Sequence, residues 1–204
     1  IDIWEVIAAA STKPFGFMPF SPGPGIGGHC IPVDPFYLTW KAREFGYSTR
    51  FIELAGEINE SMPAHVVRRT GEALNARRKS INGSRIIVVG LAYKPEVDDV
   101  RETPSFDVMN LLKAQGATVD YYDPYVPTIG RTRENSAWAG QPSVAWNETT
   151  FRGADAVVIA TAHRALDYRA LLEWSPCIID TRNAIRTHLG GNVPAEFSDR
   201  LWLA

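Results

Sequence analysis

The chain has 204 residues, of which 45% are apolar and 22% charged, a composition typical of a globular protein rather than a disordered one. Its formal net charge of -2 does not favour a nucleic-acid-binding protein, and no apolar run approaches the roughly 20 residues that span a bilayer. The two cysteines, Cys30 and Cys177, lie far apart in the sequence. We therefore expect a reduced, cytoplasmic protein, with a disulfide between them as the alternative.

The first residues predict the end of an amphipathic helix over 1–10, without the basic region that opens a signal peptide. The chain is therefore expected to begin inside a longer protein. Residues 11–33 predict a long loop rich in Gly, Pro and Phe. A long loop without secondary structure in a compact protein is often functional, so this segment is a candidate site.

Two helices are predicted after this loop. Asp34 is a good N-cap and Pro35 suits the first helical position, so a helix is expected to open there and to end at Gly46. Apolar residues at steps of three and four then predict a long helix over 51–79, which Pro63 must kink or split. A helix of this length has to pack on something large, and a partner subunit is one candidate.

From residue 83 onward, apolar runs alternate with helical patterns. The runs predict four strands, at 85–90, 117–122, 154–160 and 177–180. Between the first two, Thr103-Pro104 opens a helix that Gly116 closes. Strands that are apolar throughout and alternate with helices predict a parallel sheet covered on both faces. The predicted fold class is α/β, with a helical central segment over 1–82 and a small Rossmann-like domain over 83–204.

Cys30 is the strongest candidate for chemistry within the long loop. It lies just before the helix predicted at Asp34, and a helix N-terminus favours an anion such as the reactive thiolate. Asp34 is close enough in sequence to position a water or to take up a proton. Several glycines leave room for a ligand near the backbone, and three phenylalanines are candidates for pocket walls: Gly23, Gly25, Gly27, Gly28, Phe15, Phe17 and Phe20.

The residues alone leave a second interpretation open. A single cysteine in a glycine-rich loop is more often inert than catalytic, and Asp34 then serves only as an N-cap. A cysteine hydrolase is a third interpretation, but it needs a histidine paired with Cys30. His29 is adjacent in sequence and badly placed for that, and the other histidines lack a supporting motif: His65, His163 and His188.

Longer motifs carry a family resemblance. The run GPGIGGHCIPVDPFYL over 23–38 resembles the active-site signature of the UDP-glucose/GDP-mannose dehydrogenase family. Residues 92–104 are similar to a second family motif, and the segments at 122–124 and 180–183 also fit. The resemblance covers the whole chain. Within the family, residues 12–59 are most similar to the branch that oxidises UDP-N-acetylglucosamine.

The resemblance implies an NAD-dependent oxidation of the sugar C6 alcohol to a carboxylate, with two NAD⁺ consumed. It implies that Cys30 attacks the C6 aldehyde as a nucleophile and carries a thioester between the two oxidations. Asp34 matches the family aspartate that assists the water step. The expected substrate is UDP-N-acetylglucosamine, and UDP-glucose, UDP-N-acetylmannosamine and GDP-mannose are the alternatives.

The resemblance also assigns binding residues. Expected substrate contacts are Lys13, Phe20, Gly27, Gly28, Lys94 and Arg182. Arg101 matches a family arginine that reaches NAD, and its alternative is an ion pair with Asp98, Asp99 or Glu102. The alternative for Lys94 is a solvated loop lysine. Asp123, after the second strand, is interpreted as a turn residue rather than a ribose ligand, because the first turn lacks the full glycine fingerprint. No metal ligand is assigned.

Further expectations concern cofactor and partners. The resemblance implies that NAD is bound mainly by an N-terminal domain that this sequence does not include, so the chain alone is expected to bind NAD poorly and not to turn over. The alternative hypothesis is that the chain by itself is a nucleotide-binding and dimerisation module that catalyses no reaction. Residues 83–204 are expected to bind UDP, and the helix over 51–79 to form a homodimer. No nucleic-acid or membrane partner is expected, and the implied role is in polysaccharide synthesis.

Overall fold

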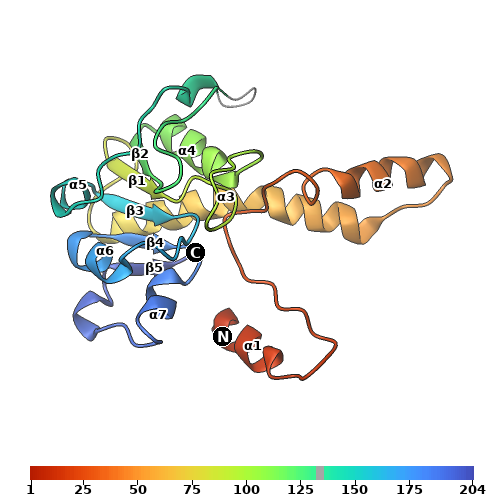
Figure 1. The fold of residues 1–204 in the computed structure, drawn as a ribbon, viewed down its shortest axis with the longest axis horizontal. Helices are drawn as coiled ribbons and strands as arrows, with labels where there is room; N and C mark the ends of the chain where they lie inside the picture. Colours follow the sequence, from red (N-terminus) through yellow and green to blue (C-terminus); the bar gives the residue numbers. More distant parts are fainter. Residues whose placement is uncertain (132–135) are drawn as a thin grey trace.

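A computed structural model describes residues 1–131 and 136–204, and it is built around one five-stranded parallel sheet (Figure 1). The strand order is β2-β1-β3-β4-β5. The strands are β1 Arg85–Val89, β2 Thr118–Tyr122, β3 Ala156–Ile159, β4 Ile178–Asp180 and β5 Leu201–Leu203. The helices are α1 Ile3–Ser11, α2 Asp34–Glu44, α3 Arg50–Ala76, α4 Pro104–Ala114, α5 Glu148–Arg152, α6 Tyr168–Trp174 and α7 Ala184–His188, with short 3₁₀ turns η1 Ser136–Trp138 and η2 Ala195–Phe197.

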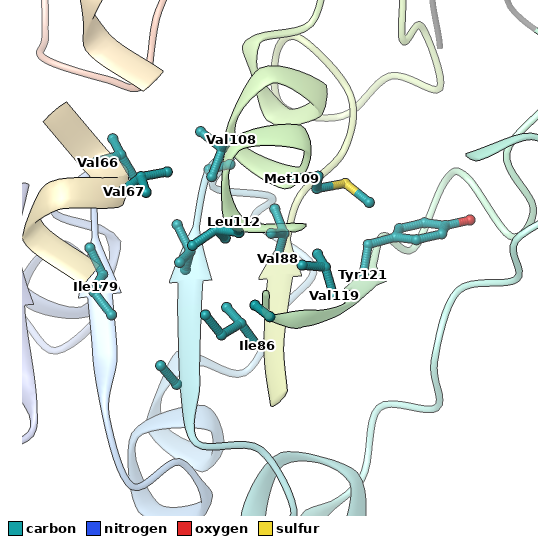
Figure 2. Close-up of a cluster of buried hydrophobic side chains, with 14 of the residues drawn as sticks. Val66, Val67, Ile86, Val88, Val108, Met109, Leu112, Val119, Tyr121 and Ile179 are labelled. Carbon is teal, nitrogen blue, oxygen red and sulfur yellow. The ribbon is translucent and has the colours of Figure 1, made fainter. Parts of the chain in front are cut away.

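Both faces of the sheet are buried. Successive residues of a strand point to opposite faces, so each strand contributes side chains to two cores. In β1, Ile86 and Val88 enter one core, and Ile87 and Val89 enter the other. Figure 2 shows the first core, where side chains of α3 and α4 meet those of the strands. Helices α5, α6 and α7 cover the opposite face. The predicted α/β class with a parallel sheet is confirmed.

Helix α3 is a single helix of 27 residues with Pro63 inside it, so of the two predicted alternatives, a kink or a split, the split does not occur. Its second half buries Val66, Val67 and Leu74 against the sheet. Its first half runs beside α2 and projects away from the sheet (Figure 1). Among the described residues, none of the helices combines the length and the apolarity that crossing a membrane requires.

The predicted elements agree with the structure except at a few ends. Helix α2 begins at Asp34, but Val33 holds the N-cap position and no side chain caps the helix, so the N-cap role expected for Asp34 is wrong. Thr103 does cap α4, accepting a hydrogen bond from the backbone N–H of Ser105. The division at residue 82 stays a proposal, and the second half of α3 shares a core with the sheet that follows it.

Candidate functional site

Cys30 is exposed and lies at the turn that leads into α2. Its carbonyl oxygen accepts hydrogen bonds from the N–H groups of Asp34, at 2.8 Å, and Val33, at 3.2 Å. The bond from Asp34 spans four residues, as in an α-helix, so the helical hydrogen bonding reaches back to Cys30. Asp34 is exposed in the same turn. The backbones of Cys30 and Asp34 are thus joined in one turn at the N-terminal end of an 11-residue helix.

The Cys30 loop, residues 23–33, is seated on the loop that follows β1. We call that second segment, residues 90–103, the β1–α4 loop. The N–H of Gly28 donates to the carbonyl of Arg101 at 3.1 Å. A Cβ on Gly27 would lie 2.5 Å from the carbonyl oxygen of Glu102 and 2.6 Å from Cβ of Tyr93, and one on Gly28 would lie 2.9 Å from the Tyr93 ring. These two positions therefore need glycine because of close packing, beyond any contact with a ligand.

A second hydrogen bond attaches the Cys30 loop to α3. The side-chain oxygen of Asn59 accepts the N–H of Ile26 at 2.8 Å. Asn59 lies in the middle of α3, between its projecting half and its buried half. The Cys30 loop is therefore held from two sides, by the β1–α4 loop and by α3.

The β1–α4 loop carries two exposed cations, Lys94 and Arg101. The guanidinium of Arg101 donates to both carboxylate oxygens of Asp99, at 2.6 to 3.1 Å. Hydrogen bonding to Asp99 raises the pKa of Arg101. The ion pair expected as an alternative for Arg101 is present, with Asp99 as its partner.

Lys94 has a different environment. Its Nζ lies 5.2 Å from the ring centroid of Tyr93, the residue that packs on Gly27 and Gly28. No carboxylate in the described part of the chain forms a salt bridge with it. An exposed ammonium without such a partner can bind a phosphate group.

Arg182 approaches the Cys30 loop from the carboxyl end of β4. Its Nε donates to the carbonyl of Ala160 at 2.8 Å, and Nη1 lies 3.5 Å from the carbonyl of Pro22. Burial lowers the pKa of Arg182, and the nearby Asp180 opposes that change. The guanidinium is thus partly used in joining the sheet to the segment that precedes the Cys30 loop.

Lys13 and Phe20 are not gathered with these residues in the structure. Both are exposed in the segment between α1 and the Cys30 loop, which Figure 1 shows running apart from the sheet. Phe15 and Phe17 are exposed in the same segment, at 78% and 41%. None of the three phenylalanines lines the large groove next to the Cys30 loop, so a wall role there is not supported.

That groove has a volume of about 810 Å³ and lies between the Cys30 loop, α2, α3 and the start of α4. Its walls are mostly apolar, with Phe36, Phe51 and Ile52 among them. Its charged residues are carboxylates: Glu60, Glu102 and Asp107. On the cationic side of the Cys30 loop, where Lys94 and Arg101 lie, Lys94 has no salt bridge in the described part of the chain and is the better candidate for a phosphate contact.

Two models of one protein family match this chain. Residues 87–187 match the family model described as UDP-glucose/GDP-mannose dehydrogenase family, UDP binding domain, and residues 1–61 match the model of the central domain of the same family. The chain belongs to the UDP-glucose/GDP-mannose dehydrogenase family.

Relatives within this family are nucleotide-sugar dehydrogenases. UDP-N-acetyl-D-glucosamine 6-dehydrogenase of Pseudomonas aeruginosa is 38% identical over 165 residues, covering 80% of this chain and 37% of that protein. UDP-N-acetyl-D-mannosamine dehydrogenase of Pyrococcus horikoshii is 34% identical over 192 residues, covering 91% of this chain and 41% of that protein. The solved structure of a UDP-D-ManNAc dehydrogenase from Pyrococcus horikoshii covers 100% of this chain and 44% of its own, with a TM-score of 0.79 and 30% identity. The chain thus spans less than half the length of these relatives.

Members of this family are NAD-dependent dehydrogenases, but the sheet domain of this chain does not fit a dinucleotide site of its own. The turn after β1 starts with Gly90 and continues without the glycine-rich fingerprint. Asp123, which follows β2, is buried, and its carboxylate accepts the N–H groups of Leu91, at 2.7 Å, and Ala92, at 3.1 Å. It also accepts the N–H of Tyr125 at 2.8 Å, so its interpretation as a turn residue is confirmed.

Sequence reasoning missed three residues that support the site. Asn59 and Tyr93 hold the Cys30 loop, and His163 is buried against Asp123. The sequence pointed to His163 only as a candidate partner for Cys30 in a cysteine hydrolase. Its contact with Asp123 spans 40 residues of sequence, and nothing but the sheet topology could have indicated it.

Proposed function

We propose that this chain is the UDP-binding and dimerisation part of an NAD-dependent nucleotide-sugar 6-dehydrogenase, a cytoplasmic enzyme of polysaccharide synthesis, and that UDP-N-acetylglucosamine is its substrate. The observation that carries the proposal is the position of Cys30. Its thiol is exposed in the turn that leads into α2, Asp34 begins that helix, and the backbone carbonyl of Arg101 accepts the N–H of Gly28, two residues before Cys30.

In the proposed reaction, the thiolate of Cys30 adds to the C6 aldehyde, and the oxygen takes up a proton to give a thiohemiacetal. Oxidation of that carbon, with loss of a hydride and a proton, leaves a thioester on the same sulfur. A water molecule, positioned by Asp34, then attacks the thioester, and the carboxylate and the thiolate separate. NAD supplies the hydride acceptor for both oxidations and is held mainly by residues outside this chain, with Arg101 as a proposed contact.

The nucleotide-binding role falls to the cationic side of the Cys30 loop. Lys94 is proposed to bind the diphosphate and Arg182 the uridine end, and Gly27 and Gly28 lie along the sugar. Lys13 and Phe20 remain proposed substrate contacts, although they are distant from this cluster in the fold. The relatives' names support both a glucosamine and a mannosamine substrate. Comparing kcat/KM for UDP-N-acetylglucosamine, UDP-N-acetylmannosamine, UDP-glucose and GDP-mannose with the full-length enzyme decides among them.

A second proposal describes the isolated chain. By itself it is proposed to bind UDP and to dimerise through α3 without catalysing oxidation. The first half of α3 exposes Phe51, Leu54 and Ile58, which a second copy of the chain would bury. NAD-dependent oxidation of UDP-N-acetylglucosamine by these 204 residues alone would contradict the catalytic part of this proposal.

The decisive experiment replaces the sulfur. In the full-length enzyme, Cys30→Ser is expected to lower the rate of acid formation at least about 10³-fold, because removal of a nucleophile abolishes the covalent step. Cys177→Ala is the matched control, since Cys177 is buried against the sheet and touches no proposed site residue. Acid formation at the native rate by Cys30→Ser would exclude Cys30 as the nucleophile.

A further inference from the structure

Two buried side chains flank the carboxyl end of β1, where the β1–α4 loop begins. Asp123 follows β2, and His163 lies four residues after the end of β3. These strands are the two neighbours of β1 in the sheet. Neither side chain is exposed to solvent, and Nε2 of His163 lies 3.1 Å from Oδ2 of Asp123.

The hydrogen bonds define the protonation of the histidine ring. The N–H of Glu96 donates to Nδ1 of His163 at 3.1 Å, so Nδ1 must carry a lone pair. The proton is then on Nε2, which donates to Asp123. Burial alone would raise the pKa of Asp123, but hydrogen bonds from His163 and from backbone N–H groups lower it below its usual value. The pair is thus a neutral imidazole against a carboxylate.

Together the two side chains hold three backbone N–H groups of the β1–α4 loop. Asp123 accepts those of Leu91 and Ala92, and His163 accepts that of Glu96. Lys94 lies between these attachment points. The position of the proposed phosphate-binding lysine therefore depends on both attachments.

Glu96 is held in an unfavourable conformation. Its φ of 65° lies in the left-handed region, which residues other than glycine seldom adopt. Besides the bond to His163, its carboxylate accepts the N–H of Arg164 at 2.7 Å, and Tyr125 contacts it at 3.4 Å. A backbone conformation of this kind persists where the surroundings over-determine it, and it often marks a functional site.

The same loop supports the Cys30 loop. The ring of Tyr93, next to Lys94, packs on Gly28, and the carbonyl of Arg101 accepts the N–H of Gly28. The N–H of Tyr93 donates to the carbonyl of Asp99 at 3.0 Å, which closes the β1–α4 loop on itself. A change at Glu96 is therefore transmitted through a short, compact segment to the backbone beside Cys30.

We infer that His163 and Asp123 are positioning residues of the nucleotide site: His163, through its Nδ1 acceptor for Glu96, fixes the β1–α4 loop that carries Lys94 and supports the Cys30 loop. The inference rests on the proposed function for its ligand, UDP. The acceptor toward Glu96 is the feature that the site needs.

Two substitutions separate the two ring nitrogens. In His163→Asn, the side-chain oxygen can take the place of Nδ1 and accept the N–H of Glu96. In His163→Gln, the longer side chain can place its amide nitrogen at Nε2 and donate to Asp123, while Glu96 loses its acceptor. We expect His163→Gln to weaken UDP binding by the 204-residue chain about tenfold, the effect of one unsatisfied hydrogen bond, and His163→Asn to stay within about twofold of the native affinity.

Amide hydrogen exchange provides a readout that does not depend on UDP. The amides of residues 93–102 are expected to exchange faster in His163→Gln than in His163→Asn, at matched thermal stability. Equal exchange in the two variants, with only a shared loss of stability, would overturn the inference and leave His163 a packing residue. A native chain that fails to bind UDP would contradict the proposed function, while the exchange comparison would still decide the positioning role.

The unsubstituted protein gives a test that survives a variant that does not fold. Nitrogen-15 NMR of the imidazole is expected to show a proton on Nε2 and a hydrogen-bonded lone pair on Nδ1. A proton on Nδ1 would overturn the inference directly, because Glu96 would then have no acceptor.

Discussion

The two halves of α3 have opposite surroundings within one continuous helix. In the second half, Val66 and Leu74 are fully buried against the sheet. In the first half, Phe51 is 89% exposed and Leu54 is 51% exposed. The apolar spacing is similar in both halves, so the pattern predicts a helix with one apolar face but does not tell what covers that face. The chain's own sheet covers the second half, and a second copy is proposed for the first.

The Cys30 loop is attached where these two halves meet. Asn59 holds Ile26 from the middle of α3, and the large groove beside the loop is lined by Phe51 and Ile52 of the projecting half and by Pro104 of the sheet domain. The loop is therefore attached both to the sheet domain, through Arg101, and to α3 beside its projecting half, through Asn59. Assembly through the projecting half would add rigidity next to Cys30.

The largest expected effect tests the buried half. Leu74→Ala is expected to lower the free energy of unfolding by about 2–5 kcal/mol, because it leaves a cavity in the core between α3 and the sheet. Leu54→Ala is the same substitution on the same helix, and it is expected to change this free energy by less than about 0.5 kcal/mol. Urea unfolding at a concentration where the chain is monomeric measures both. Similar losses for the two variants would mean that the projecting half is also covered within one chain.

Much of the fold could be predicted from the sequence, but what covers each half of α3 could not. The apolar runs at 85–90 and 154–160 predicted strands because they are long and β-branched. Strand β5, with only Leu201, Trp202 and Leu203, is too short to show a period, and its pairing with β4 over three residues depends on the tertiary fold. The signature around Cys30 predicts a nucleophile at that position, and this stays a prediction. The pairing of Asp123 with His163 was not predictable, because it joins the ends of two strands that flank a third.

A smaller effect is expected at the junction. Gly27→Ala would place a Cβ 2.5 Å from the carbonyl oxygen of Glu102, so the Cys30 loop must shift away from the β1–α4 loop. We expect a cost of about 1–3 kcal/mol, an overpacking penalty, together with faster amide exchange at Gly28. Gly130→Ala is the control, because its Cβ would meet nothing within 4 Å among the residues that the structure describes. Native exchange at Gly28 in the Gly27→Ala variant would show that the two loops are not packed as tightly as described.

Substitutions in the projecting half of α3 are expected to have the smallest effect on the free energy of unfolding of one chain. They are expected to have the largest effect on dimer assembly. Leu54→Asp places a charge where the proposed second copy would bury it, so the dimer dissociation constant is expected to rise at least about tenfold. Leu111→Asp is the control. It makes the same change on α4, at a position that is 36% exposed and lies outside the projecting half of α3. Sedimentation velocity over a dilution series measures both variants against the native chain. If the native chain stays monomeric, or if both variants weaken the dimer equally, α3 is not the interface. Its exposed apolar face would then be covered by another part of the enzyme.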